Sequence, residues 1–246
     1  MFDYYLVCPS YNRPLIFKNK TYSFLKLTNA PLDRLVVFVA SEEQKVLYQQ
    51  LDLSLNIVVG IKDIAKQRNF IQNYYPLGAK IVSIDDDIKL IWKKDDTYRT
   101  GKRVIEDFNE LVELGFSLAE KADSNIWGIY PLHNSYFMKD RVYTKLCYII
   151  GAFYGFINKR IYCPEEYPSA EDFWRSLYYY KTQGKLCRLD NYGLDTKYYN
   201  PVGGLSDIRT IEKNNSDKSA IQQMFPDLCK TYYKKDRIEL RFKKST

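Results

Sequence analysis

Short apolar runs alternate with amphipathic stretches through the first third of the chain. Apolar runs at residues 4–8, 34–40, 57–59 and 80–84 predict buried strands. Stretches with helical spacing lie between them at 21–27, 42–50 and 64–74, and the first of these starts from a Thr21 cap. This alternation with short links predicts an α/β domain with a doubly wound, mostly parallel central sheet flanked by helices.

The pattern is less regular after residue 90. A long helical pattern covers residues 104–121, a strand is predicted at 126–130, and a helix at 171–180. The Tyr- and Ile-rich stretch 143–157 predicts a hairpin or a bent pair of strands. The chain turns polar beyond Gly203-Gly204. We therefore expect one domain over residues 1–210 and a polar, basic C-terminal extension over residues 211–246, packed on the domain or trailing from it.

Polar residues gather directly after two of the predicted strands. The segment 9–14 (PSYNRP) follows the first strand, and Asp85-Asp86-Asp87 follows the fourth. In sheets of this kind ligands bind beyond the carboxyl ends of the strands. We therefore expect the two clusters to lie at the same edge of the sheet.

The three consecutive aspartates are the strongest chemical signal. Adjacent carboxylates repel one another, and a divalent cation, which prefers carboxylate oxygens, removes that cost. Alternate residues of an extended segment face the same way, so Asp85 and Asp87 can approach one ion while Asp86 points towards a ribose or a sugar. The competing interpretation is a solvated acidic turn or a helix cap.

Three further side chains suit a nucleotide. Tyr11 can stack on a pyrimidine base, and Arg13 can pair with a phosphate. Arg68 lies in the helix that precedes the aspartate-bearing strand, from where it can reach a diphosphate or a uracil edge. The alternatives are an ordinary polar turn for the first two residues and a surface arginine for the third.

An acidic pair, Glu171-Asp172, opens the helix predicted at residues 171–180. The helix macrodipole alone favours carboxylates at that position. The functional interpretation makes one of the two the general base, which takes the proton from an acceptor hydroxyl group as that group attacks an anomeric carbon. The sequence leaves open which of the two plays this role.

Composition narrows the class of protein. No apolar stretch reaches the length of a membrane span, so no membrane partner is expected. The 5 cysteines show no CxxC spacing and no signal peptide is visible, which indicates a reducing, cytoplasmic compartment. The single histidine, His133, excludes a histidine-rich metal site.

The formal net charge of +7 suits a polyanionic partner such as nucleic acid, although a generic basic surface explains it equally well. A basic cluster follows the aspartates and is a candidate for phosphate contacts; it comprises Lys93, Lys94, Arg99, Lys102 and Arg103.

The order of these motifs resembles that of the GT-A glycosyltransferases. P-S-Y-N-R-P comes first, then a Glu-rich helix after V-V-F-V, then G-I with Q-R-N, then I-D-D-D-I, and finally E-D-F-W-R-S-L. Over residues 4–207 the chain is most similar to the group that includes the base-J glucosyltransferases and the phage enzymes that glycosylate hydroxymethylpyrimidines in DNA.

The resemblance implies a UDP-sugar donor, Mn²⁺ or Mg²⁺, and inversion at the anomeric carbon. It places Asp85 and Asp87 at the metal and Glu171 or Asp172 at the acceptor as the base. The residues that it places along the donor nucleotide are Pro9, Ser10, Tyr11, Arg13, Arg68, Asp85 and Asp86. Many GT-A enzymes use a late histidine as a further metal ligand; here no histidine follows His133, so Asp207, or water and phosphate oxygens, would take its place.

These expectations combine into one leading function and two rivals. The leading function is transfer of a sugar, glucose or a pentose such as arabinose, to the hydroxymethyl group of a modified pyrimidine in DNA, as in a bacteriophage enzyme acting in the host cytoplasm. One rival is a transferase with a glycan, lipid or protein acceptor. The other is an inactive transferase fold that binds nucleic acid. The oligomeric state stays open.

Overall fold

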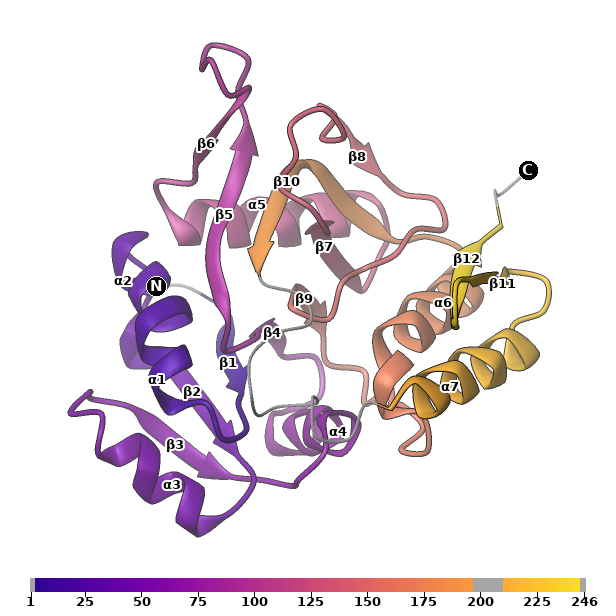
Figure 1. Cartoon of the computed structure of the whole chain (residues 1–246). Coiled ribbons are helices and arrows are strands. Elements are labelled where there is room, and N and C mark those ends of the chain that lie inside the picture. The colour runs from indigo at the N-terminus through magenta and orange to yellow at the C-terminus, as the bar shows by residue number, and fades with distance from the viewer. Residues whose placement is uncertain (1–2, 197–209, 244–246) are drawn as a thin grey trace.

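The computed structural model describes residues 3–196 and 210–243. Most of its strands form one large sheet, in the order β3-β2-β1-β4-β9-β7-β10-β5-β6, with β8 added on β10 (Figure 1). In chain order these strands are β1 (Tyr5–Pro9), β2 (Leu35–Val39), β3 (Asn56–Val59), β4 (Lys80–Ile84), β5 (Ile88–Lys94), β6 (Lys102–Val104), β7 (Ile126–Tyr130), β8 (Val142–Tyr143), β9 (Phe153–Ile157) and β10 (Cys187–Thr196).

The first half of the sheet is parallel, as predicted. Strand β1 pairs with both β2 and β4, and β2 pairs with β3, all in parallel. The crossovers contain α3 (Glu42–Gln49) and α4 (Ile64–Tyr74). Each helix starts at a side-chain cap: Ser41 accepts a hydrogen bond from the Gln44 amide, and Asp63 accepts one from the Ala65 amide. The predicted fold class, an α/β domain with a large, mostly parallel central sheet flanked by helices, is confirmed.

The second half of the sheet changes direction. Strand β9 runs antiparallel to both β4 and β7, and β10 runs antiparallel to β5. The predicted pairing within residues 143–157 is wrong, because β8 pairs with β10 while β9 enters the centre of the sheet. Helix α5 (Phe108–Lys121) begins at an Asp107 cap, later than predicted, because residues 102–104 form β6 against β5.

The predicted cap at Thr21 is also wrong. Residues 14–27 form one continuous helical segment made of α1 (Pro14–Phe17), the π-helical turn η1 (Lys18–Tyr22) and α2 (Ser23–Leu27). Thr21 lies in the middle of this segment and is fully buried. A π-helical turn inside a helix often marks a functional position, and here it directs Thr21 towards the aspartates.

Side chains that alternate along β1 enter different hydrophobic clusters. Leu6 belongs to the cluster that also contains Phe108 of α5, whereas Val7 belongs to the cluster on the other face, with Ile71 of α4. This is the two-residue period of a strand that is covered on both faces. The 5 cysteine thiols are buried and free. The structure also has two short 3₁₀ turns, η2 (Leu32–Arg34) and η3 (Pro168–Ala170).

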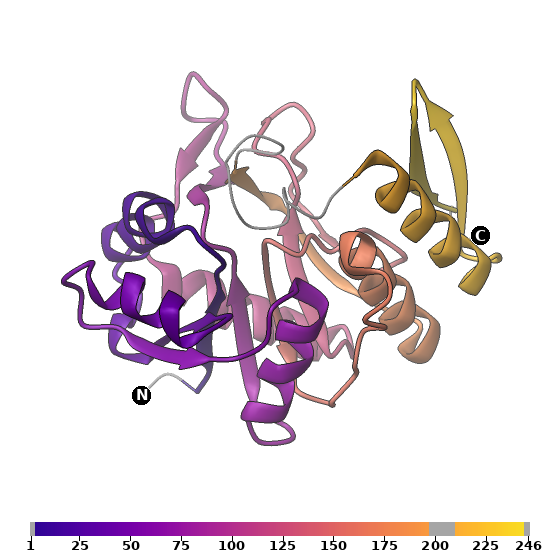
Figure 2. The ribbon, with the colours of Figure 1, turned by 60° about the horizontal axis from the view of Figure 1, so that its bottom comes forward.

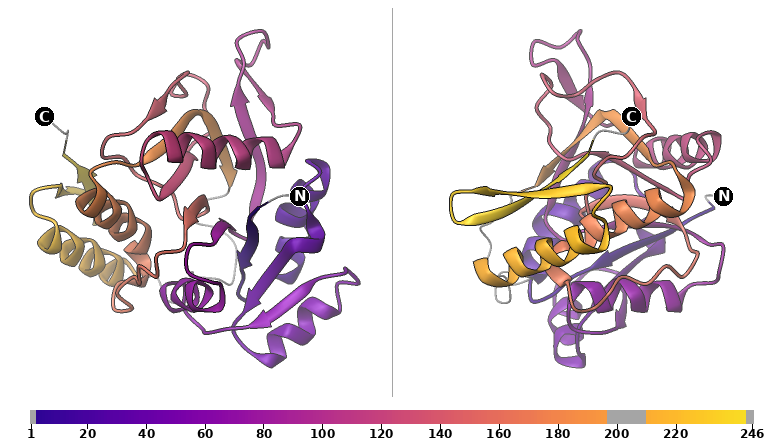
Figure 3. Two further views of the ribbon diagram at one scale, coloured as in Figure 1. Left: turned by 180° about the vertical axis from the view of Figure 1, so that it is seen from behind. Right: turned by 90° about the vertical axis from the view of Figure 1, so that its right-hand side faces the viewer.

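The described part of the C-terminal segment is folded. Helix α7 (Ile211–Met224) precedes a hairpin of β11 (Cys229–Lys234) and β12 (Arg237–Phe242), and the two strands form a separate antiparallel sheet. A third cluster, with Trp174, Leu177, Ile221 and Leu240, joins this segment to α6 (Glu171–Gln183). Figures 2 and 3 show α7 and the hairpin as an outer layer beside α6, on the opposite side of the molecule from α3. The domain boundary at residue 210 stays a prediction.

None of the helices in residues 3–196 and 210–243 combines the length and the apolar character needed to cross a membrane.

Candidate functional site

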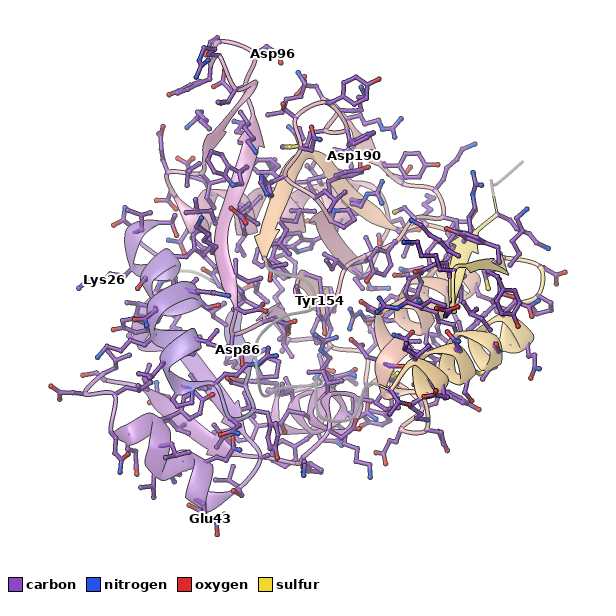
Figure 4. The ribbon with its side chains drawn as sticks, in the orientation of Figure 1. Lys26, Glu43, Asp86, Asp96, Tyr154 and Asp190 are labelled. Atoms are coloured by element: carbon purple, nitrogen blue, oxygen red, sulfur yellow. The ribbon has the colours of Figure 1, made fainter. Side chains whose placement is uncertain are left out.

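The two polar clusters that follow β1 and β4 meet at one edge of the sheet, as the sequence predicted. The Ser10 hydroxyl group donates a hydrogen bond to Asp86 Oδ2 at 2.5 Å and shares another with the Tyr48 hydroxyl group. Arg13 Nη1 lies 3.4 Å from Asp86 Oδ1 and 3.9 Å from Asp87 Oδ2. Figure 4 shows Asp86 near the middle of the molecule, where the ends of these strands converge.

Asp86 points into the protein. The residue is 5% exposed, and its two oxygens contact Ser10 and Arg13. Burial raises the pKa of its carboxyl group to about 7, and the nearby Arg13 guanidinium only partly opposes this shift. In this conformation Asp86 organises the loop, and its contact with a ribose stays a prediction.

Asp85 is the more accessible neighbour, with a side chain that is 32% exposed. Its carboxylate lies 3.1 Å from Arg68 Nη2, and its backbone amide donates to the Ala152 carbonyl group at 2.8 Å. Desolvation raises the pKa of Asp85 to about 6, against the lowering effect of Arg68. The Thr21 hydroxyl group donates to the Asp85 carbonyl oxygen at 2.6 Å and accepts from the Ile88 amide at 3.0 Å, so Thr21 holds both ends of the aspartate loop.

Asp87 turns towards the last strand of the sheet. Its Oδ1 accepts a hydrogen bond from the Thr196 hydroxyl group at 2.8 Å, at the end of β10. Thr196 was not identified from the sequence. It reaches the aspartate loop because β10 pairs with β5, and the paired residues are about a hundred positions apart in the chain. Strand β10 thereby brings its end to the aspartate loop.

Glu171 is clamped between two arginines. It forms ion pairs with Arg68 and, at 2.9 Å, with Arg175 Nη1. Both guanidinium groups lie over the ring of Tyr154, at 5.5 Å for Arg68 and 3.7 Å for Arg175, and Tyr154 is labelled beside the centre of Figure 4. Glu171 is 6% exposed, so two positive charges neutralise it inside the protein. The sequence analysis did not predict that Arg175 pairs with Glu171, although side chains four residues apart on a helix can contact each other.

Asp172, the next residue, has a different environment. It is half-buried and accepts hydrogen bonds from the Tyr148 hydroxyl group, from the Gly151 amide at 3.3 Å and from the Phe173 amide at 2.9 Å. Among the described residues, no arginine or lysine forms an ion pair with Asp172. The two acidic neighbours are therefore distinct: one faces two cations, and the other faces neutral donors.

Gly151 joins these two environments. Its amide contacts Asp172, and its carbonyl oxygen accepts from Arg68 Nη2 at 2.8 Å. A Cβ atom at this position would lie 2.7 Å from Arg68 Nη1 and 3.0 Å from Glu171 Oε1. A side chain at this position would therefore displace the guanidinium group of Arg68 or the carboxylate of Glu171 from the ion pair.

The remaining nucleotide candidates lie around the first loop. Pro9 ends β1, Tyr11 follows with Lys62 Nζ 5.3 Å from the centre of its ring, and Asn12 adopts a left-handed φ of 55°. Neither Pro9 nor Tyr11 takes part in the aspartate contacts, and their roles at a nucleotide stay predictions. Asp207 lies outside the described residues.

Much of the predicted basic cluster is engaged within the protein. Lys94 pairs with Asp96 and Asp140, and Arg103 pairs with Asp95 and Glu106. Lys102 Nζ lies 2.6 Å from both Nδ1 and the carbonyl oxygen of His133. These three cations already have partners, which weakens the case for phosphate contacts in this cluster.

The two partly exposed carboxylates of the aspartate loop can bind a hard cation if other groups supply further ligands. Asp85 and Asp87 supply the oxygen ligands that Mn²⁺ and Mg²⁺ accept. In residues 3–196 and 210–243, no group of three or more His, Cys, Asp or Glu side chains is placed to hold a metal. A cation at this loop therefore depends on further oxygens from a bound diphosphate, from water or from outside the described residues.

Comparisons with known proteins identify the fold. No protein-family model and no curated protein matches the sequence. Among solved structures, TarS 1–349 of S. aureus in complex with UDP matches with a TM-score of 0.57 at 15% identity, over 92% of this chain and 66% of that one. GalNAc-T7 with UDP, GalNAc and Mn²⁺ matches with a TM-score of 0.58 at 10% identity, over 90% of this chain and 48% of that one.

A third match has a lower TM-score. It is the glucosyl-3-phosphoglycerate synthase of Mycobacterium tuberculosis in complex with Mn²⁺, UDP-glucose and phosphoglyceric acid, with a TM-score of 0.50 at 11% identity, over 93% of this chain and 83% of that one. The chain spans 66% of the length of the TarS fragment. Identities this low establish the fold alone. The chain has the GT-A glycosyltransferase fold.

Proposed function

We propose that this protein is a metal-dependent, inverting glycosyltransferase that uses a UDP-sugar donor. The observation that carries the proposal is the aspartate loop at the carboxyl ends of β1 and β4. There Asp86 is held inward while Asp85 and Asp87 remain partly accessible, beside Arg13 and Arg68. Ligands bind at this edge in open α/β sheets, and the loop combines oxygen ligands with guanidinium groups that suit a diphosphate.

Asp85 and Asp87 would hold the cation, Mn²⁺ or Mg²⁺, which neutralises the diphosphate as it leaves. Arg13, whose side chain is 13% exposed, is the better placed of the two arginines to approach a phosphate. The side chain of Arg68 is 6% exposed and contacts Asp85, Glu171 and Gly151. We therefore assign Arg68 to orienting Asp85 rather than to touching the diphosphate.

Asp172 is the proposed general base. Its carboxylate takes the proton from the acceptor hydroxyl group as that oxygen attacks the anomeric carbon, and the bond from that carbon to the diphosphate oxygen breaks. Attack from the face opposite the leaving group inverts the anomeric centre. Glu171 suits this role poorly, because its oxygens are engaged by Arg68 and Arg175 and the residue is only 6% exposed.

The proposed acceptor is the hydroxymethyl group of a modified pyrimidine in DNA. The motif order and the net charge of +7 support this part of the proposal. A pyrimidine in a duplex must leave the base stack to reach Asp172. Acceptors of the rival classes, namely a glycan, a lipid or a protein, are distinguished from DNA by direct assay.

A transfer assay tests the proposal. The purified protein is incubated with Mn²⁺, a panel of UDP-hexoses and UDP-pentoses, and DNA that contains either hydroxymethylcytosine or cytosine. Mass spectrometry of the nucleosides should show a glycosylated hydroxymethyl base and no product from the cytosine DNA. Absence of product with every donor contradicts the DNA acceptor.

Calorimetry of UDP with and without Mn²⁺ tests the donor site separately. Binding that needs Mn²⁺ supports the transferase assignment. Metal-independent binding, or none, favours an inactive transferase fold.

A further inference from the structure

The C-terminal hairpin has one face packed against the protein and one face turned away from it. Cross-strand register places the pairs Cys229–Phe242 and Thr231–Leu240 on the inner face, where Cys229 and Leu240 are buried. The alternate pairs form the outer face of the hairpin, which consists of Lys230, Tyr232, Lys234, Arg237, Glu239 and Arg241.

Like charges face each other on this outer face. Lys230 stands directly opposite Arg241, and Lys234 stands directly opposite Arg237, with all four residues exposed. The Cβ atoms of directly opposed residues in antiparallel strands are about 4.5–5.5 Å apart, and like charges on such a pair are destabilising. The Lys230–Arg241 pair therefore does not add to the stability of the hairpin.

The acidic residue on the same face does little to offset these charges. Glu239 lies opposite Tyr232, and its carboxylate pairs with Lys218 of α7 at 2.9 Å. In the described part of the chain, no carboxylate lies within ion-pair distance of Lys230, Lys234 or Arg241. The face presents Lys230, Lys234 and Arg241 around Tyr232, a residue that is 46% exposed.

We propose that the outer face of the hairpin binds the phosphodiester backbone of DNA. Lys230 and Lys234 are four residues apart on one strand, roughly 13 Å at the rise of a β-strand. One strand of DNA carries a phosphate every ~3.4 Å of helix axis. Cations spread along the hairpin between Lys230 and Lys234 can therefore contact several consecutive phosphates. The Tyr232 hydroxyl group adds a neutral donor to a phosphate, or its ring adds a surface for a base.

The base of the hairpin lies next to the proposed general base. The ring of Phe242 packs against those of Tyr148 and Phe173, at 6.5 and 6.0 Å between ring centres, and Tyr148 donates to Asp172. Arg241 directly precedes Phe242, so it lies at the end of the hairpin that packs on Tyr148 and Phe173, with its side chain on the outer face. The proposal builds on the DNA acceptor put forward above and identifies the surface that holds it.

The test is the salt dependence of DNA binding by the full chain, measured by fluorescence anisotropy with a labelled oligonucleotide. The double variant Lys230→Gln/Arg241→Gln should bind at least about tenfold more weakly at low salt, and the slope of log K against log salt should fall by about 2. The exchange variant Lys230→Arg/Arg241→Lys keeps both charges and should bind like the wild type.

A second control removes two exposed charges that lie outside the hairpin, in α2 and α5, with the variant Lys26→Gln/Lys121→Gln, and should change binding little. Equal weakening by this control, or no DNA binding by the wild type, overturns the proposal. Binding to vesicles rich in anionic lipid without binding to DNA overturns it in favour of a membrane surface.

Two further readouts separate the possible causes of failure. Lys230→Gln/Arg241→Gln should melt at the same or a higher temperature than the wild type, because it removes a repulsive pair; a lower melting temperature contradicts the argument. UDP binding with Mn²⁺ should be the same in all variants. If the wild type does not bind UDP with Mn²⁺, the transferase function is refuted. The effect of the hairpin variants on DNA binding is measured separately and does not depend on that outcome.

Discussion

The hydroxyl group of Tyr148 donates a hydrogen bond to the carboxylate of Asp172. Tyr148 also stacks on Phe173, the next residue of α6, with 4.6 Å between ring centres. These contacts hold Asp172 in place with neutral donors, whereas its neighbour Glu171 is held by two cations. The functional difference between two adjacent acidic residues is therefore a difference in the partners that surround them.

Replacing the two acidic residues one at a time should separate catalysis from stability. Asp172→Asn should lower kcat by roughly 10²–10⁴-fold, because the acceptor loses its proton-accepting group, while UDP affinity and the melting temperature change little. Steady-state kinetics and calorimetry check this.

Glu171→Gln should act mainly on the fold. It leaves Arg68 and Arg175 buried without a balancing charge, which costs roughly 3 kcal/mol of unfolding free energy. Chemical denaturation measures that loss. A stable Glu171→Gln variant with no activity would reverse the two assignments.

Tyr148→Phe should lower the rate of turnover. Asp172 loses one of the donors that hold its carboxylate in place, so kcat should fall by about tenfold while UDP affinity changes little. The phenyl ring keeps the stacking on Phe173, so unfolding free energy should fall by only about 1 kcal/mol. An unchanged kcat contradicts this role.

The metal-free protein should lose stability as the pH rises from about 4 to about 7. Burial raises the pKa of Asp86 to about 7, whereas an unfolded aspartate titrates near 3.9. Between these values the folded state binds more protons than the unfolded state, so unfolding free energy decreases with increasing pH.

Asp86→Asn should reduce this dependence, and the raised pKa of Asp85 accounts for part of what remains. In the presence of a chelator the variant should melt at a higher temperature than the wild type at pH 8, by the equivalent of a few kcal/mol at most, and the difference should vanish near pH 4. Thermal melts across that range provide the measurement. A wild type that grows more stable over the same interval excludes the buried-carboxylate explanation.

Asp85→Asn and Asp87→Asn should each weaken Mn²⁺-dependent UDP binding by at least tenfold, because each removes a charged oxygen ligand. Asp52→Asn is the matched control: Asp52 is exposed, and its left-handed φ of 54° is one that asparagine tolerates. Titration calorimetry with and without Mn²⁺ provides the comparison. Unaltered UDP affinity in both loop variants would place the metal elsewhere.

Local pattern predicted the elements whose signal lies within a few residues. Residues 80–84 and 64–74 were predicted with the bounds that the structure has, because a buried strand and an amphipathic helix each show their period over one short stretch. Residues 102–104 were misassigned to a helix, because their strand conformation depends on pairing with β5.

The sequence by itself determined the parallel half of the sheet, the place of the three aspartates at a strand end, and the position of that loop at the same edge as the segment that carries Ser10 and Arg13. Those follow from the period of apolar residues and from the rule that parallel strands end at one edge. Only the tertiary structure decided that Thr21 and Thr196 hold the loop, that Glu171 is neutralised while Asp172 is not, and that like charges face each other on the hairpin. Each of these depends on contacts between segments that are distant in the chain or on strand register. The local period of apolar residues does not tell which distant segment a side chain or strand will contact.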